Sequence, residues 1–199
     1  MKKVRIKRVV RHIFILIPQM IIIIAGPSGV GKTTLAKKLA KRFQLPVIHK
    51  DDIKEILFDT LGSESLERAK ELGKASWEIF YHFAEEQISN DVSLILESNF
   101  KARFAEEVFI KFKKKYDVNI IQIMCKANIN TIVERFKKRA VEDRHPGHND
   151  HLISETNLRK GIEEESIPLN INAPLIEMDM NDFGSVDYEA LFAKIEELK

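Results

Sequence analysis

The residues from Gly26 to Thr34 have the types and the spacing that a phosphate-binding loop needs. They read Gly-Pro-Ser-Gly-Val-Gly-Lys-Thr-Thr and match the pattern G-x-x-x-x-G-K-[ST] in full. Glycines let the backbone curl tightly, so that successive N–H groups converge on a phosphate at the start of the next helix. Lys32 would reach the β- and γ-phosphates, Thr33 would bind Mg²⁺ and Thr34 would contact the α-phosphate of a triphosphate such as ATP. The residues expected to contact this nucleotide are Gly26, Ser28, Gly29, Val30, Gly31, Lys32, Thr33 and Thr34.

A second acid is needed to hold the Mg²⁺ beside the Thr33 hydroxyl. Glu97 ends the apolar run Ser-Leu-Ile-Leu-Glu, which places it at the carboxyl end of a strand, where ligands bind in open α/β sheets. We therefore expect Glu97 to be the second metal ligand. Glutamate is longer than the aspartate usual at this position, so action through a water molecule, or contact with an acceptor, stays open.

Two further acids follow the second apolar run. Asp52 and Glu55 have the spacing of a helix N-cap and its acidic partner. That assignment leaves Asp51 free to point into the cleft above the sheet, where a carboxylate can accept the proton of an attacking hydroxyl. Asp51 is thus the expected catalytic base, and a purely structural role for both aspartates is the alternative.

Three arginines lie late in the chain, on a predicted helix and just beyond it. Arg135 and Arg139 are four residues apart on one helical face, which is mildly unfavourable unless a polyanion lies nearby, and Arg144 follows. We expect Arg139 to stabilise the charge of the transferring phosphoryl group, and Arg135 and Arg144 to bind the nucleotide phosphates. Which of them contacts the transferred phosphate stays open, and a solvated basic face is the alternative.

The elements that must position these residues alternate along the chain. Expected strands are Met20–Ala25, Pro46–His49, Val92–Glu97, Asn119–Lys126 and Pro174–Asp179. Expected helices are Lys32–Phe43, Ile53–Leu61, Ser65–Ser89, Ala105–Lys115, Thr131–Val141, Glu155–Glu165 and Tyr188–Leu198. Short apolar strands alternating with helices indicate a three-layer α/β fold with a parallel sheet. The polar stretch 142–151 contains Pro146 and Gly147, so we expect a mobile lid at about residues 139–151.

Composition restricts the class of protein. The chain of 199 residues carries 32 basic and 30 acidic side chains, a balance that disfavours a protein that coats duplex nucleic acid. Cys125 is the only cysteine, so no disulfide forms within the chain, which fits the cytoplasm. The apolar run at residues 13–17 is far shorter than the roughly 20 residues of a membrane span. We interpret residues 1–19 as an N-terminal extension that need not be native, and residues 20–199 as one domain.

These motifs resemble those of the zeta-toxin and polynucleotide-kinase-like group of small P-loop kinases, which includes uncharacterised AAA-type ATP-binding proteins. The resemblance runs from Met20 to about Arg144, and rests on the phosphate loop, HKDDIKEIL, LILESNF and TIVERFKKRA. It implies a five-stranded parallel sheet in the order 2-3-1-4-5 with a helical lid. It also implies that Asp51 is the general base and Arg139 the lid arginine. Lys54 stands where that family usually has arginine.

The expected protein is therefore an ATP- and Mg²⁺-dependent kinase that transfers the γ-phosphate to a hydroxyl. A small-molecule acceptor is the first expectation, because no basic and aromatic stripe indicates a long nucleic-acid track. A 5′-hydroxyl nucleic-acid end is the close alternative, and an ATPase switch without a phosphorylated product is another. A nucleoside monophosphate kinase would need a second phosphate clamp, for which Lys101 or Arg103 could serve. We expect a cytoplasmic monomer or dimer with no membrane contact.

Overall fold

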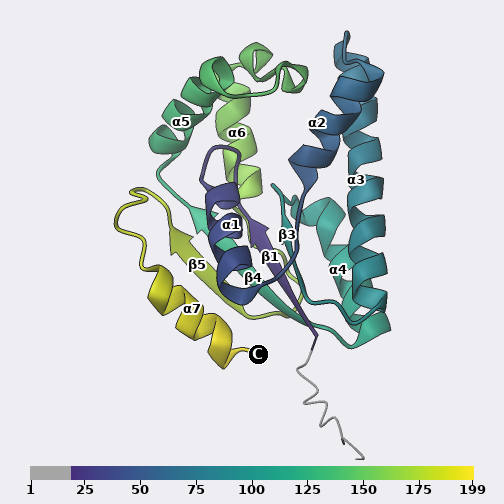
Figure 1. The fold of residues 1–199 in the computed structure, drawn as a ribbon. Coiled ribbons are helices and arrows are strands. Elements are labelled where there is room, and N and C mark those ends of the chain that lie inside the picture. Colours follow the sequence, from purple (N-terminus) through teal and green to yellow (C-terminus); the bar gives the residue numbers. More distant parts are fainter. Residues whose placement is uncertain (1–18) are drawn as a thin grey trace, which may run out of the picture.

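A five-stranded parallel sheet forms the centre of the computed structural model, which describes residues 19–199 (Figure 1). The strand order is β2-β3-β1-β4-β5, which confirms the predicted fold class and sheet order. The strands are β1 (Met20–Ala25), β2 (Val47–His49), β3 (Leu94–Glu97), β4 (Asn119–Lys126) and β5 (Leu175–Asp179). Because β1 pairs with both β3 and β4, the loop that follows it lies at the middle of the sheet edge.

Helices cover both faces of this sheet. They are α1 (Lys32–Phe43), α2 (Lys50–Leu61), α3 (Leu66–Ser89), α4 (Ala102–Tyr116), α5 (Ile129–Glu142), α6 (Glu155–Glu165) and α7 (Tyr188–Glu197). Alternate isoleucines of β1 divide the core, as the two-residue period of a strand requires. Ile22 and Ile24 pack in the cluster with α1, α5, α6 and α7, whereas Ile21 and Ile23 pack with α3 and α4. Burial of β1 on both faces explains its unbroken apolar sequence.

Several helices begin earlier than the sequence indicated. Helix α2 starts at Lys50, and His49 is its N-cap residue without a side-chain cap bond, so the predicted cap at Asp52 is wrong. Asp51 and Asp52 lie instead in the first helical turn, where acidic side chains are stabilised by the helix dipole. Asp51 therefore lies on the first turn of α2, two residues after the end of β2.

The predicted lid segment is more regular than expected. Two short 3₁₀ helices, Pro146–His148 and Asp150–Leu152, fill the connection between α5 and α6. Gly147 is required there because a Cβ atom at this position would come within 2.4 Å of the Phe58 ring of α2. The lid segment therefore packs closely on α2, and Figure 1 shows both at the same end of the molecule.

The predicted N-terminal extension falls outside the described residues except for Gln19. The Gln19 side chain donates hydrogen bonds to the carbonyls of Ile88 and Val92, and its own carbonyl accepts from Asn119 N–H at the start of β4. Gln19 thus continues the pairing of β1 by one residue. In residues 19–199, no helix combines the length and apolar character needed to cross a membrane.

Candidate active site

The phosphate loop lies between β1 and α1, as the sequence motif predicted. Gly26 and Gly31 have φ angles of +136° and +108°, which side-chain-bearing residues rarely adopt. A Cβ atom on Gly26 would also come within 2.5 Å of the Cys125 carbonyl oxygen. Val30 is fully buried, and Thr34 is exposed on the first turn of α1. The loop backbone is therefore fixed by packing against β4 and the core, whereas the first turn of α1 is exposed at Thr34.

Lys32, Thr33 and Glu97 lie together at the base of this loop. The Lys32 ammonium donates to the Pro27 carbonyl at 3.0 Å and lies 4.0 Å from the Glu97 carboxylate. The Thr33 hydroxyl donates to Glu97 at 3.2 Å. A hydroxyl and a carboxylate are the oxygen ligands that Mg²⁺ uses in phosphate-binding sites, where water and phosphate complete its shell. The pair therefore fits a magnesium ion, as the sequence suggested.

His49 is a neighbour of this site that the sequence reasoning missed. It ends β2 opposite Glu97 in the sheet register, and its Nδ1 lies 2.7 Å from Glu97 Oε2, the same oxygen atom that accepts from Thr33. The hydrogen bond to Glu97 raises the pKa of His49 against the effect of burial. His49 therefore holds the orientation of the carboxylate that meets Thr33. The sequence signal that could have predicted this role is the place of His49 at the end of a strand, where Glu97 also lies.

Asp51 and Arg144 form an ion pair across the cleft. The Arg144 guanidinium donates to the Asp51 carboxylate at 2.9 Å, and the Lys50 ammonium lies 3.7 Å from the other carboxylate oxygen. Burial raises the pKa of Asp51, but the positive charges of Arg144 and Lys50 outweigh it and hold the pKa well below its usual value. Asp51 is thus ionised, and its Oδ2 atom is already occupied.

Arg144 is the centre of a network that joins the lid segment to α2. It also donates to Asp150 at 3.2 Å and lies 2.9 Å from His148 Nδ1. His148 Nε2 in turn lies 2.9 Å from Glu55, and His145 Nε2 lies 3.0 Å from Asp59. Asp51, Glu55 and Asp59 are spaced four residues apart, which places them on one face of α2. That acidic stripe was the sequence signal that could have predicted where the lid segment docks.

Arg139 has hydrogen-bond donors that no described residue satisfies. Its Nε and Nη2 atoms are shielded from solvent, yet neither has a hydrogen-bond partner in residues 19–199. The nearest acid, Asp150, is 3.8 Å away. Burial lowers the pKa of Arg139, which shows that the positive charge is poorly solvated. Such donors are costly to leave unpaired, so the site suits an anion with several oxygen atoms.

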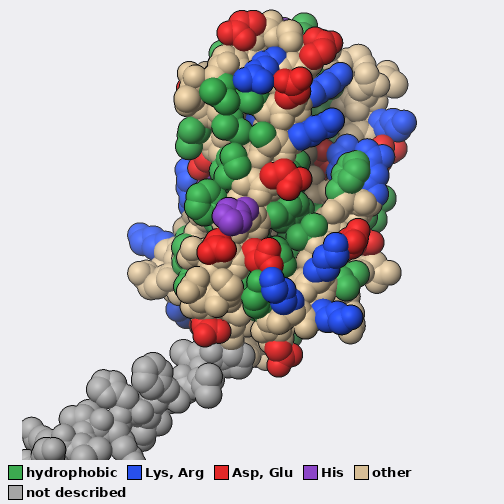
Figure 2. Space-filling view, turned by 90° about the vertical axis from the view of Figure 1, so that its right-hand side faces the viewer, with side chains coloured by type: hydrophobic (Ala, Val, Ile, Leu, Met, Phe, Trp, Pro, Cys, Tyr) green, Lys and Arg blue, Asp and Glu red, His purple; other side chains and the backbone are tan. Residues whose placement is uncertain are grey.

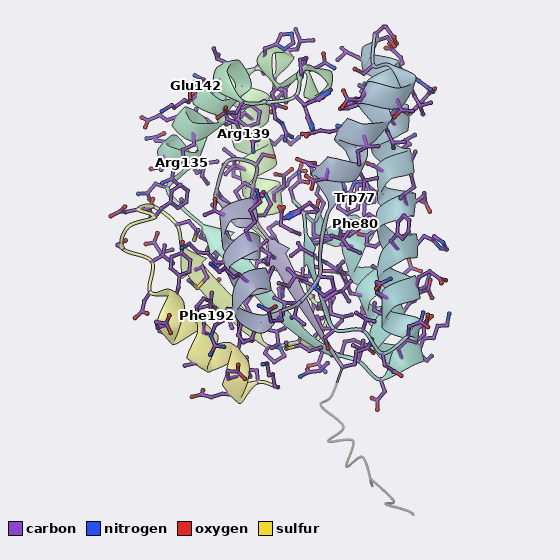
Figure 3. All side chains as sticks on the ribbon, viewed as in Figure 1. Trp77, Phe80, Arg135, Arg139, Glu142 and Phe192 are labelled. Carbon is purple, nitrogen blue, oxygen red and sulfur yellow. The ribbon has the colours of Figure 1, made fainter. Side chains whose placement is uncertain are left out.

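Arg135 points elsewhere, although it lies on the same helix (Figure 3). It donates at 2.7 Å to the carbonyls of Met180 and Asn181, just after β5. Its guanidinium also lies 4.0 Å from the centre of the Phe183 ring. The structure therefore does not bring Arg135 together with Asp51 and Arg144 as a phosphate ligand, because its donors are used to fasten α5 to the β5–α7 loop.

Glu165, at the end of α6, also lies in the site, and no sequence pattern predicted it. Its carboxylate accepts from the Ser28 N–H of the phosphate loop at 3.4 Å and from the Asn99 side-chain amide at 2.7 Å. Burial raises its pKa despite these donors and nearby Lys32. Ser28 and Glu165 are separated by 137 positions, so only the folded chain could reveal this contact.

A cavity of about 240 Å³ lies between Asp51 and one residue of the phosphate loop, Ser28. Its lining includes Ser28, Lys50, Asp51, Arg144, His148 and Glu165. The phosphate loop thus contributes one wall, α2 the second, the lid segment the third and α6 the fourth. The cavity brings the predicted base next to the predicted phosphate site.

Comparison with known protein families identifies the chain. The pattern described as an AAA domain matches residues 21–155. The chain belongs to the AAA domain family. A crystal structure described as a "putative kinase" from Chloroflexus aurantiacus has 31% identical residues and a TM-score of 0.81, covering 92% of this chain and 98% of that chain. These matches place the chain in a P-loop kinase-like family, whereas the finer resemblance to zeta toxins stays a prediction.

More distant solved structures share the fold. A gluconokinase from Sinorhizobium meliloti has 13% identity and a TM-score of 0.57, over 91% of this chain and 94% of that one. A chain of the Pnkp1/Rnl/Hen1 RNA repair complex has 17% identity and a TM-score of 0.56, over 78% of this chain and 50% of that one. At such identities the likeness shows the fold alone. A comparison with curated proteins gave no match.

Proposed function

We propose that this protein is an ATP- and Mg²⁺-dependent kinase that phosphorylates a hydroxyl of a small-molecule acceptor. One observation carries the proposal: the carboxylate of Asp51 and the phosphate-loop residue Ser28 line the same cavity. A hydroxyl held by Asp51 would therefore lie next to the γ-phosphate. The unpaired donors of Arg139 support the same reaction, because charge builds up on the phosphoryl oxygens during transfer.

The proposed reaction is an in-line displacement. The acceptor oxygen attacks the γ-phosphorus, its proton passes to an Asp51 carboxylate oxygen, and the bond from phosphorus to the β–γ bridging oxygen breaks to release ADP. Lys32 would move from the Pro27 carbonyl to the β- and γ-phosphate oxygens. Mg²⁺, when held by Thr33 and Glu97, supplies positive charge to the same oxygens. Arg139 would donate to the transferring phosphoryl group through Nε and Nη2.

Asp51 must be released before it can act as a base. In the Arg144 pair its pKa is low, so it holds a proton poorly. An acceptor hydroxyl that takes the place of Arg144 at Oδ2 would remove that charge from direct contact and raise the basicity of the carboxylate. Displaced Arg144 would then be free to bind phosphate, which is the role proposed for it from the sequence.

The size of the cavity favours a small acceptor. About 240 Å³ is below the usual range for drug-sized ligands, so only the reacting part of an acceptor fits inside. A small molecule is therefore the proposed acceptor, and a 5′-hydroxyl nucleic-acid end is the alternative. The reducing cytoplasm remains the proposed location, from the single cysteine.

The test is ATP consumption with and without acceptor. Mixtures of sugars, polyols, nucleosides and 5′-hydroxyl oligonucleotides are incubated with the protein, labelled ATP and Mg²⁺, and labelled products are separated from phosphate. A kinase gives a labelled acceptor that Asp51→Asn abolishes. Slow release of phosphate at one rate in every mixture would instead indicate an ATPase switch.

A further inference from the structure

A second, larger cavity lies on the outer side of the sheet, between α3 and α4. Its volume is about 670 Å³, and we call it the α3–α4 groove. Its lining includes Lys74, Trp77, Tyr81, Asn99, Arg103 and Phe104. Figure 2 looks at this side of the molecule and shows exposed hydrophobic side chains with Lys and Arg side chains beside them. Nothing in the proposed phosphoryl transfer uses this groove.

The walls of the groove are aromatic. Trp77 and Tyr81 stack with their ring centres 5.3 Å apart and their planes 23° from parallel. Phe100 is fully buried behind Trp77, 5.7 Å away, and fixes the position of the indole ring. On the α4 side Phe104 is 66% exposed, which is unusual for so large an apolar ring unless it meets a ligand or partner. The groove therefore offers flat apolar surfaces from both helices.

Positive charge accompanies the rings. Lys74 lines the groove, and the Arg103 guanidinium lies 4.8 Å from the centre of the Phe104 ring. Arg103 reaches Glu164 only at 3.9 Å, whereas Lys101 is firmly paired to Glu164 at 3.0 Å. Lys74 and Arg103 are thus available to an anionic group in the groove, whose lining also contains one carboxylate, that of Glu78.

The groove adjoins the cavity that is lined by Asp51. Asn99 lines both, and its amide is bonded to Glu165. The Lys50 ammonium, 3.7 Å from Asp51, lies 5.4 Å from the centre of the Trp77 ring. Trp77, labelled on α3 in Figure 3, therefore lies near the lysine that contacts Asp51. A single ligand could reach from the base into the groove.

We propose that the α3–α4 groove binds the distal part of the acceptor, and that this part is a heteroaromatic ring carrying an anionic group, as in a nucleoside monophosphate. The ring would stack between Trp77 and Phe104, the anion would meet Arg103 and Lys74, and the hydroxyl would extend to Asp51. This inference rests on the proposed kinase function, because it assigns the groove to the same acceptor.

Two alternatives explain the groove less well. A plain sugar or polyol fits the smaller cavity and leaves the exposed Phe104 ring without a partner. A long nucleic-acid strand needs free cations beyond the groove, yet two lysines on α4 are already paired, Lys111 to Glu107 at 2.7 Å and Lys115 to Glu85 at 2.8 Å. A ligand of nucleotide size matches both the volume and the charge.

The chain carries its own reporter for this site, because Trp77 is its only tryptophan. Intrinsic fluorescence is measured without ATP while thymidine 3′-monophosphate is added, since this probe combines a ring, an anion and a free 5′-hydroxyl. We expect saturable quenching. Thymidine and inorganic phosphate, each with one of the two features, should quench with at least roughly tenfold weaker affinity, the ratio that corresponds to about 1.4 kcal/mol.

Two surface variants assign the site. Phe104→Ala and Arg103→Ala should each raise the dissociation constant on the order of tenfold, a loss typical for one stacking or charge contact. The matched control is Phe83→Ala, which removes an exposed ring from α3 outside the groove and should leave the constant unchanged. All three variants are checked by thermal unfolding, and their surface positions should leave the melting temperature close to wild type.

The outcomes separate this inference from the proposed function. No quenching, or equal weakening of binding by all three variants, overturns the groove assignment. ATP consumption that depends on some other acceptor would still support the proposed kinase function. Quenching that is weakened by Phe104→Ala and Arg103→Ala but not by Phe83→Ala, together with ATP-dependent formation of a bisphosphorylated product, supports both the groove assignment and the proposed kinase function. Groove binding without any phosphorylated product overturns the assignment of this ligand as acceptor, and a parallel failure of every other acceptor overturns the kinase.

Discussion

The guanidinium of Arg139 comes within 3.8 Å of the Asp150 carboxylate, yet it makes no hydrogen bond with that residue. Asp150 is bonded instead to Arg144 at 3.2 Å. The charge of Arg139 is therefore partly balanced while its Nε and Nη2 donors stay free. This arrangement leaves a cation on α5 whose hydrogen bonds are not yet used.

Replacing Arg139 with lysine should lower turnover more than ATP binding. A lysine keeps the charge but cannot provide the planar set of donors that phosphoryl oxygens meet during transfer. We expect kcat to fall on the order of a hundredfold, with the dissociation constant of ATP changed by no more than a few-fold. Lys138→Ala, an exposed neighbour on α5, is the control for helix α5. An ATP affinity lost in parallel with kcat would indicate ground-state binding instead.

Asp51→Asn should abolish most turnover while ATP binding persists. An amide cannot take the acceptor proton, so we expect kcat to fall by roughly 10²- to 10⁴-fold. Asp52→Asn is the matched control, because Asp52 is exposed in the first turn of the same helix. Steady-state rates and ATP titrations measure both effects. If Asp52→Asn proves the more damaging change, the wrong acid has been assigned as base.

Lys32→Ala should remove most ATP affinity or turnover and leave the fold intact. The ammonium is buried at the phosphate loop and contacts only the Pro27 carbonyl and Glu97, so its charge serves the ligand. Binding is measured by calorimetry and folding by circular dichroism. Lys41→Ala, on the exposed last turn of α1, should behave like wild type. A folded Lys32→Ala protein with normal ATP turnover would contradict the phosphate-loop assignment.

Docking of the lid segment on α2 should weaken in acid. Burial and the nearby Arg144 charge lower the pKa of His148 to about 3, from an ordinary value of 6.5. Between these two pH values His148 is protonated in the undocked lid segment but neutral in the docked one. The free energy of docking therefore becomes less favourable as the pH falls from 6.5 toward 3. The charged groups around His148 are Arg144, Asp51, Lys54, Lys50 and Glu55.

Hydrogen exchange across residues 144–150 measures this effect. After correction for intrinsic rates, protection should drop on the order of tenfold between pH 7 and pH 5. His148→Gln removes the titrating group and should flatten the dependence. Equal corrected protection at both pH values in the wild-type protein would show that His148 does not control docking.

Gly147→Ala should loosen the lid segment through a steric clash. The added methyl group would lie 2.4 Å from the Phe58 ring, so the segment must move away from α2. We expect faster exchange of the lid amides and a raised KM for the acceptor, with ATP affinity changed little. Gly73→Ala in α3 is the matched control, since its Cβ would meet only the Lys54 side chain, at an ordinary distance of 3.5 Å. Similar effects from both variants would point to general destabilisation.

Local patterns predicted the place of the loop between β1 and α1 and of Glu97 at a strand end. The loop from Gly26 to Thr34 is one continuous segment, and so is the strand that carries Glu97. Local backbone preferences are therefore enough to predict each of them. The sheet order followed from the family resemblance and was confirmed. Helix starts were less certain, because the first turn of α2 is formed by residues that also suit a cap.

The acceptor side depended on contacts that no local pattern encodes. Arg135 and Arg139 share a helical face, but the β5–α7 loop captures one guanidinium and leaves the other free. Glu165 meets Ser28 only because α6 returns over the phosphate loop. The α3–α4 groove combines aromatic and basic residues from two helices, which explains why no stripe was visible along the sequence.

The ion pair between Arg144 and Asp51 affects how readily the proposed kinase would transfer phosphate to water. Water is a competing acceptor, and a free carboxylate beside a bound nucleotide would activate it as readily as a hydroxyl. While Arg144 occupies Oδ2, a lone water molecule gains too few contacts to displace it, whereas a larger acceptor anchored elsewhere can do so. Futile ATP hydrolysis would then be suppressed by the same contact that holds the lid segment closed, and Arg144→Ala should raise it.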